Sequence, residues 1–151
     1  MSFEFRDATL EDVSFILSIR NKDETRKWLH NTSKFSLEEG LDWFRNTNPT
    51  MYILMKDGVD VGYFRTSDWD SSSVCVGADI HPDHRGKGYA KVFYNLILEY
   101  LRRDFKKSLF WLKVFKENEV ALNLYKKLGF DIVSEGYNGE RLELTMQKVV
   151  K

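Results

Sequence analysis

The order of helical and strand patterns along the chain predicts a mixed α/β sheet, and two observations carry this prediction. Asp57-Gly58 separates the apolar runs "MYILMK" and "VDVGYFR", which is the typical signature of a β-hairpin. Later in the chain, helical patterns at 91–103 and 118–130 alternate with strand patterns. Because a helix between two strands usually crosses over to a parallel neighbour, we expect some parallel pairing in this second half.

The first half is expected to open with a strand at 2–8, where phenylalanines alternate with polar residues. Thr9 followed by Asp12 is typical of a helix N-cap, and an apolar helical face follows it. A short helical pattern covers 23–31, and the capping box "SLEE" at 36–39 begins a further helix ahead of the hairpin.

The second half is expected to alternate between strand and helix. A glycine inside its first strand, Gly77, indicates a bulge or a close approach of another group to the backbone. Gly129 is placed to end the last helix. The predicted elements are a strand at 73–80, a helix at 91–103, a strand at 108–115, a helix at 118–130 and strands at 130–134 and 141–148.

Length and composition predict a single domain over residues 1–151 in the cytoplasm. Lys plus Arg equals Asp plus Glu at 23 each, so no global charge draws the chain to nucleic acid or to a membrane surface. No apolar run has the length of a membrane span, and the first residues lack the features of a secretory signal. One cysteine cannot form an internal disulfide, and no Cys–His pair has zinc spacing, so we expect no metal.

The segment "HPDHRGKGYA" (81–90) stands where a strand gives way to a helix, and it predicts a phosphate-binding loop. First-turn amides of a helix lack internal partners and point outward at the positive end of the helix dipole. Gly86 and Gly88 would let the backbone approach an anion, and Arg85 and Lys87 add positive charge. A charged turn without a ligand is the alternative, and the spacing fits neither a Walker loop nor a Rossmann loop.

Two motifs in this order resemble the GCN5-related N-acetyltransferase (GNAT) superfamily. The first is Arg85-x-x-Gly88-x-Ala90, and the second lies in "NEVALNLYKKLGF" at 118–130. The resemblance implies the GNAT fold, an α/β fold with about four helices. Its mixed, mostly antiparallel sheet has six to seven strands and splays open at a cofactor slot.

The resemblance also implies acetyl-CoA as co-substrate, with no metal. The loop would hold the CoA pyrophosphate, the preceding strand would bond the pantetheine arm up to Ile80, and Asn118 would bond it further along. The implied cofactor-binding residues are Ile80, Arg85, Gly86, Lys87, Gly88, Tyr89, Ala90 and Asn118. A helix cap is an alternative role for Asn118 and is compatible with cofactor contact.

By the same resemblance, Tyr125 is the general acid that protonates the departing thiolate while the amine attacks directly. A core aromatic is the alternative interpretation, because apolar stripes on helices usually pack. Relatives that acetylate protein N-termini carry Glu where this chain has Lys113, which puts peptide acetylation in doubt. Asp79 is therefore the candidate general base, with a structural hydrogen-bonding role as its alternative.

The acceptor is expected to be a small-molecule amine, bound by a monomer or a homodimer. Arg20, Asn21 and Trp28, followed by "SLEEGLDWF", resemble the branch that acetylates nucleotide-linked amino sugars, as in pseudaminic acid synthesis. An arginine can pair with a diphosphate, and an aromatic ring can stack on a base or sugar. Acetylation of protein N-termini or other small amines is the alternative, and a non-catalytic acyl-CoA-binding module is an alternative of another class.

Overall fold

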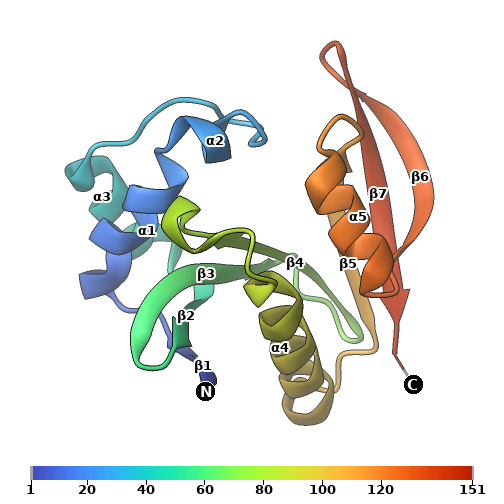
Figure 1. Cartoon of the computed structure of the whole chain (residues 1–151), viewed down its shortest axis with the longest axis horizontal. Coiled ribbons are helices and arrows are strands. Elements are labelled where there is room, and N and C mark those ends of the chain that lie inside the picture. The colour runs from blue at the N-terminus through green and yellow to red at the C-terminus, as the bar shows by residue number, and fades with distance from the viewer. Residues whose placement is uncertain (1, 151) are drawn as a thin grey trace. The chain divides into compact units, whose positions relative to one another are not determined.

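The computed structural model describes residues 2–150, within which seven strands form one mixed sheet in the order β1-β2-β3-β4-β5-β7-β6 (Figure 1). The strands are β1 (Phe3–Asp7), β2 (Thr50–Lys56), β3 (Val59–Ser67), β4 (Ser73–Ile80), β5 (Leu109–Phe115), β6 (Asp131–Asn138) and β7 (Arg141–Val149). The helices are η1 (Leu10–Asp12), α1 (Val13–Arg20), α2 (Asp23–Arg26), α3 (Leu37–Thr47), η2 (Pro82–His84), α4 (Tyr89–Phe105) and α5 (Glu119–Lys127). The predicted α/β class and mixed sheet are confirmed, and four of the α-helices described have eight or more residues.

The chain divides into two compact units, one made of residues 1–66 and 77–93 and the other of residues 67–76 and 94–151. In the first unit, β1 and β3 pair antiparallel with β2. The hairpin between β2 and β3 turns at Asp57 and Gly58, whose φ angles of 52° and 81° are both positive, as a type I′ turn requires. The predicted hairpin is therefore confirmed.

Both faces of the strands in the first unit are covered. On one face, Ile16 and Ile19 of α1 pack against Met51, Ile53 and Tyr63, and all five side chains are buried. Helix α1 therefore has a fixed position over β2 and β3, which places its C-terminal residues beside the site described below.

The other face of these strands is lined with aromatic rings. The ring of Phe3 meets the rings of Tyr89 and Phe93 edge to face, with centroids 5.5 and 5.4 Å apart, and Phe5 meets Tyr52 in the same way at 5.6 Å. Phe3 of the predicted first strand thus packs against the first turns of α4, and Phe5 packs within the sheet.

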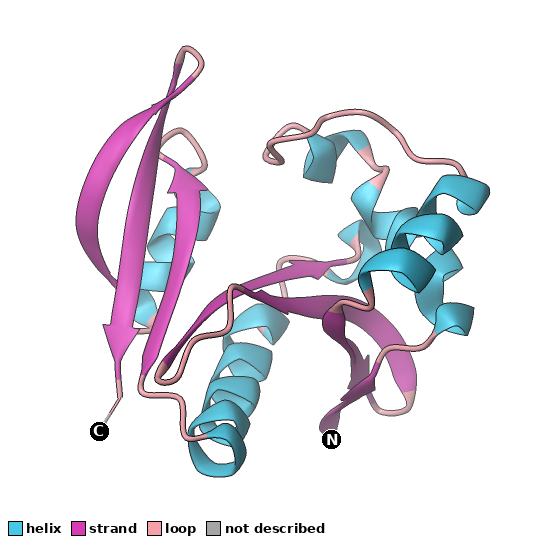
Figure 2. Cartoon of the chain, turned by 180° about the vertical axis from the view of Figure 1, so that it is seen from behind, coloured by secondary structure: helices cyan, strands magenta, loops and turns pink. Residues whose placement is uncertain are grey.

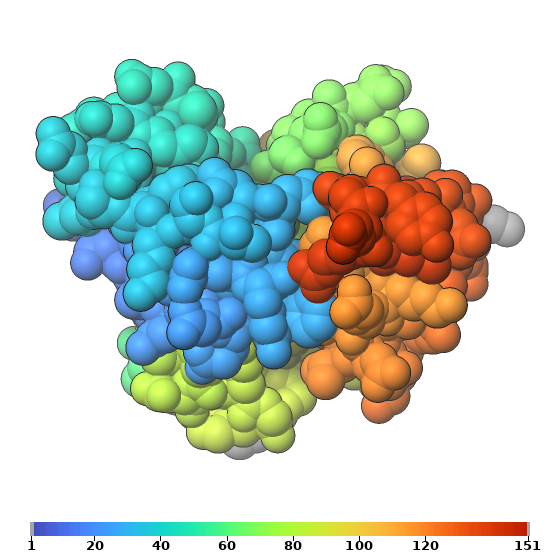
Figure 3. All heavy atoms as spheres, turned by 90° about the horizontal axis from the view of Figure 1, so that it is seen from above, coloured from blue at the N-terminus to red at the C-terminus, as the bar shows by residue number. Residues whose placement is uncertain are grey.

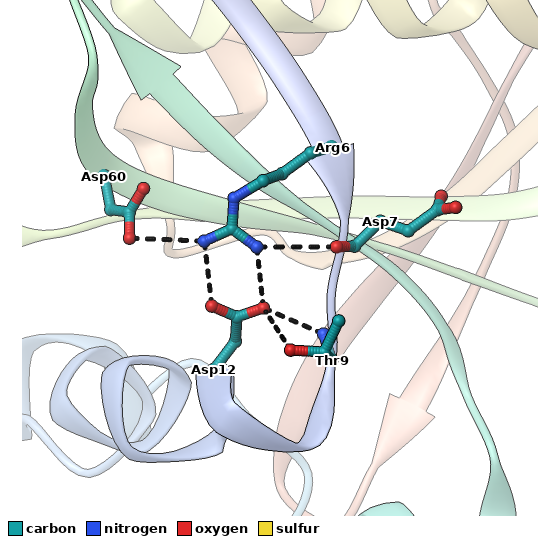
Figure 4. A network of polar contacts seen from close by, with 5 residues as sticks. All are labelled: Arg6, Asp7, Thr9, Asp12 and Asp60. Carbon is teal, nitrogen blue, oxygen red and sulfur yellow. Dashed lines mark hydrogen bonds and ion pairs between the residues drawn. The ribbon is translucent and has the colours of Figure 1, made fainter.

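The turn from β1 into the first helices is held by a buried carboxylate (Figure 4). Asp12 accepts two hydrogen bonds of 2.8 Å from the guanidinium of Arg6 and a third, also 2.8 Å, from the backbone N–H of Thr9. Asp60 adds a longer ion pair of 3.5 Å to Arg6. The hydrogen bond from Arg6 holds the pKa of Asp12 below its usual value, so the carboxylate is stabilised in its charged form.

In the second unit, Ser73–Cys75 of β4 pair in parallel with Leu109–Trp111 of β5, which confirms the expected parallel pairing. Strand β7 pairs antiparallel with both β5 and β6, and α5 lies along one face of these strands (Figures 1 and 2). The predicted splay of the sheet at a cofactor slot stays a prediction.

Two predicted boundaries were wrong. The helical pattern at 23–31 forms α2 only over Asp23–Arg26, because the amides of Trp28 and Leu29 bond three residues back and tighten the chain into turns. The strand expected at 130–134 continues to Asn138, because β7 pairs with it as far as the Asn138–Arg141 turn.

Candidate active site

The glycine loop lies at the C-terminal end of β4 and leads through η2 into α4. Gly86 and Gly88 have φ angles of 76° and 77°, a backbone conformation that residues with a side chain rarely adopt. A Cβ built on either glycine would meet no protein atom within 4 Å, so the space in front of the loop is open. The loop is exposed at the surface (yellow-green in Figure 3). It precedes a helix of 17 residues, whose first amides face outward.

The guanidinium of Arg85 supports this loop from behind. Its Nε donates to the carbonyl of Ile80 at 2.7 Å, and its Nη2 donates to the hydroxyl of Thr25, a buried residue of α2, at 2.8 Å. Nε and Nη2 of Arg85 therefore bond to groups of the protein itself. The anion-binding character of the loop then rests on its backbone amides, the α4 dipole and exposed Lys87, and this set of donors fits a pyrophosphate.

The end of strand β4 carries a cluster of charged and polar side chains. Asp79 lies 3.4 Å from Arg65 of β3 (Oδ2 to Nη2), and its side chain keeps 18% of its exposure. The hydroxyl of Tyr63, also on β3, is buried next to Asp79. Burial raises the pKa of Tyr63 well above its usual value, and the charge of Asp79 adds to this effect. Sequence reasoning selected Asp79 but missed Arg65 and Tyr63.

Arg20 and Asn21, predicted to bind the acceptor, hold the segment between α2 and α3 in place. Arg20 donates to the carbonyls of Ser33 and Asn31 at 2.7 and 2.8 Å, and it stacks 4.0 Å above the ring of Phe35. The side chain of Asn21 donates to the carbonyl of Phe35 at 2.7 Å and accepts from its N–H at 2.9 Å. The structure thus gives both residues a structural task, and acceptor contact stays a prediction for each.

The electrostatic surroundings connect Arg20 with the β4 cluster. Burial lowers the pKa of Arg20, the nearby charge of Arg26 lowers it further, and Tyr63 and Asp79 raise it. Trp28, the third predicted acceptor residue, is half-buried with the ammonium of Lys27 5.2 Å from its ring centroid. Arg65 thus contacts Asp79 directly, and the charge of Asp79 acts on Arg20.

A shallow depression of about 400 Å³ lies between α1 and the segment that leads into α3. Serine hydroxyls, lysine ammonium groups and apolar side chains line it. Its lining residues are Ser14, Leu17, Ser18, Asn21, Lys22, Lys34, Phe35 and Leu37. Of the predicted acceptor residues, Asn21 is in this lining.

The second motif lies in the other compact unit. Asn118 is the N-cap of α5, where its side-chain oxygen accepts from the N–H of Ala121 at 3.4 Å, so the alternative capping role is present. Tyr125 is half-buried, and its ring meets those of Tyr94 and Phe130 at centroid distances of 5.8 and 6.0 Å. The ring is therefore packed between aromatic neighbours, and roles in cofactor contact and proton transfer stay predictions for these two residues.

Two features are absent from residues 2–150. No group of three or more His, Cys, Asp or Glu side chains among them is arranged to hold a metal ion. None of their helices combines the length and the apolar character needed to cross a membrane.

Comparison with known proteins gives consistent matches. The model of the acetyltransferase (GNAT) family matches residues 14–130. The L-amino acid N-acyltransferase MnaT of Escherichia coli is 25% identical over 113 residues, which are 70% of this chain and 65% of that protein. The acetyltransferase PseH of Campylobacter jejuni is 26% identical over 87% of this chain and 84% of its own length.

A solved structure with the same fold is the spermidine N-acetyltransferase of Vibrio cholerae in complex with CoA and spermine. It superposes with a TM-score of 0.89 at 19% sequence identity and covers 97% of this chain and 95% of its own. The likeness confirms the fold that the two motifs predicted.

Proposed function

Because the chain belongs to the acetyltransferase (GNAT) family, we propose that it moves the acetyl group of acetyl-CoA onto the primary amine of a nucleotide-linked amino sugar. The enzyme class and the acyl donor of the family are those predicted from the sequence. The observation that supports donor binding best is the glycine loop, whose two positive φ angles and open front suit an approaching pyrophosphate.

Acetyl-CoA supplies the acyl group as an activated thioester. In the proposed reaction, the amides of residues 85–90 bind its pyrophosphate, while Ile80 and Asn118 bond the pantetheine arm. An amide of β4 donates to the thioester carbonyl and stabilises the negative charge that develops on its oxygen. These residues thereby hold the carbonyl carbon in place for the acceptor amine.

Two side chains are proposed to move protons. As the amine nitrogen bonds to the carbonyl carbon and the carbon–sulfur bond breaks, Asp79 accepts the proton that the amine loses. Tyr125 donates a proton to the departing thiolate. The carboxylate of Asp79 supports this role because it is partly exposed near the end of β4, the strand proposed to hold the acyl donor.

Support for the amino-sugar acceptor comes from the resemblance of the segment after Arg20 to that branch and from the match with PseH over 84% of its length. A free amino acid is the second candidate. It is favoured by the name of MnaT, an L-amino acid N-acyltransferase, and by the juxtaposed charges of Asp79 and Arg65.

A direct test is to incubate the purified protein with acetyl-CoA and a panel of amines, and to follow free thiol release and product mass. The panel contains a UDP-linked 4-amino sugar, free amino acids, a ribosomal N-terminal peptide and spermidine. We expect the amino sugar to be acetylated most efficiently. Binding of acetyl-CoA without acetylation of any amine would instead favour the acyl-CoA-binding module, and efficient acetylation of the peptide alone would favour the N-terminal alternative.

A further inference from the structure

Thr25 is a buried polar residue on α2, a helix of four residues, and its hydroxyl contacts a part of the chain 60 residues away. This hydroxyl accepts a hydrogen bond of 2.8 Å from Nη2 of Arg85. Thr25 is only 3% exposed, whereas its neighbours Asp23 and Glu24 are exposed. Because a buried hydroxyl is costly to leave without a partner, this bond fixes α2 relative to Arg85.

Arg85 begins the glycine loop and bonds to the protein through two of its nitrogens. While Nη2 donates to Thr25, Nε donates to the carbonyl of Ile80, the last residue of β4, at 2.7 Å. A guanidinium is planar and rigid, so these two bonds hold it in one orientation. The start of the loop is therefore tied to two elements, the end of β4 and helix α2.

The next residue of α2 bonds to the segment proposed to bind the acceptor. Arg26 donates through Nη1 to the carbonyl of Thr32 at 2.8 Å and through Nε to the carbonyl of Asn21 at 3.0 Å. Helix α2 thus bonds to the glycine loop through Thr25 and to residues 31–35 through Arg26.

Residues 31–35 belong to no helix or strand and are mostly exposed, and such segments open locally at a low cost in free energy. If this segment and α2 open together, Arg85 loses its bond to Thr25, and the loop loses support on that side. A ligand shifts an equilibrium between two states by the difference in its affinity for them. A donor that binds the supported loop more tightly therefore favours the closed segment.

We propose that Thr25 is a positioning residue that couples binding of the acyl donor at the glycine loop to the order of residues 26–35. This inference rests on the proposed binding of acetyl-CoA and adds a connection between the donor site and the proposed acceptor site. The bound donor thereby stabilises the segment that the acceptor amine meets.

Amide hydrogen exchange with and without saturating CoA tests this coupling and needs no acceptor. In wild type, CoA should slow exchange in peptides covering residues 26–35 by roughly 5- to 10-fold, a factor that one hydrogen bond can supply. Thr25→Val keeps the shape of the side chain and removes the hydroxyl. It should lose this protection, while CoA still protects residues 85–93. Its affinity for CoA should fall by a similar factor, because coupling between two sites is reciprocal.

Two variants separate the hydrogen bond from packing. Thr25→Ser keeps the hydroxyl and loses a methyl group, so it should retain the protection of residues 26–35. Thr66→Val removes the hydroxyl of another buried threonine, which donates to the carbonyl of Thr50 at 2.8 Å between β3 and β2. This control should leave the protection by CoA unchanged. Thermal melting with CoA checks that each variant folds and binds the ligand.

Each outcome bears on a different statement. Protection that persists in Thr25→Val, or that is absent from wild type with CoA bound, overturns the coupling while donor binding stands. Loss of protection in Thr25→Ser as well would assign the effect to packing and overturn the role of the hydroxyl. A Thr25→Val variant that no longer binds CoA overturns the coupling too, since one hydrogen bond cannot carry the whole affinity. A wild type that does not bind CoA overturns the proposed function itself.

Discussion

The glycine loop at 85–90 and the segment at 20–35 that is proposed to bind the acceptor, here called the acceptor segment, belong to the same compact unit, yet they are built in opposite ways. The loop is shaped by its backbone, with two glycines at positive φ and an open front. The acceptor segment is shaped by side chains, because Arg20 and Asn21 bind the carbonyls and amide of the chain that follows them. A binding site made of backbone amides can be inferred from the spacing of glycines in the sequence. The role of an arginine cannot be inferred in this way, because its guanidinium can bind either a ligand or the carbonyls of its own chain.

The largest expected effect tests the backbone side of this comparison. Gly88→Glu places a negative side chain where the pyrophosphate is proposed to bind, and we expect it to abolish the rise in melting temperature that acetyl-CoA causes in wild type. Gly58→Glu is the matched control, because Gly58 has a φ of 81° and equally open surroundings in the hairpin turn. Both variants carry similar backbone strain, so a thermal shift lost in both would show that strain, and not the loop, is responsible.

This contrast also explains what the sequence could predict. The glycine positions, the Asp57-Gly58 turn and the alternating apolar patterns each restrict the backbone locally, so the mixed sheet and the hairpin were predicted correctly. The phosphate-binding role of the glycine loop stays a prediction. Arg65 was missed because its contacts with Asp79 and Gly77 join two different strands, and only the internal Gly77 hinted at such a close approach. The end of α2 was misplaced because Trp28 and Leu29 continue an apolar pattern through tight turns.

A second effect concerns Tyr125, for which a packing role and a role as general acid predict different outcomes. Tyr125→Phe keeps the ring that packs against Tyr94 and Phe130 and removes only the hydroxyl. If Tyr125 is the general acid, kcat should fall by about 100-fold with the affinity for acetyl-CoA nearly unchanged, since general acid catalysis typically contributes about 10²–10⁴-fold. Steady-state kinetics and a binding titration measure the two quantities, and full activity of the variant would leave Tyr125 a packing residue.

A third effect contrasts Arg6, which binds the carboxylate of Asp12, with Arg20, which binds backbone carbonyls. Asp12→Asn breaks the charge pair with Arg6, and we expect a loss of about 2 kcal/mol in the free energy of unfolding, less than for a fully buried pair because Arg6 is partly exposed. Because its pKa is lowered in the folded state, Asp12 stabilises the protein above its unfolded pKa of 3.8, and this contribution is lost as the pH falls through the folded value.

Urea unfolding at neutral pH and near pH 3 checks both parts of this prediction. The difference between wild type and Asp12→Asn should shrink on acidification, because the wild-type carboxylate becomes protonated. A difference that stays constant would mean that Asp12 acts through shape and hydrogen bonding alone. Arg20 offers the opposite case, since neither a guanidinium nor a carbonyl titrates in this range.

The smallest expected effect distinguishes two roles for Arg20, support of residues 31–35 and binding of the acceptor. Arg20→Gln removes two hydrogen bonds to the carbonyls of Asn31 and Ser33 and the stacking on Phe35. We expect a loss of about 1–2 kcal/mol in the free energy of unfolding and faster amide hydrogen exchange in residues 31–35, because the segment then opens locally. Arg45→Gln, which removes an exposed arginine of α3, should change neither quantity by a comparable amount. If Arg20→Gln instead raises the KM for the acceptor without altering hydrogen exchange in residues 31–35, Arg20 binds the acceptor. The side chains of the acceptor segment would then form a ligand site, as the backbone of the glycine loop is proposed to do.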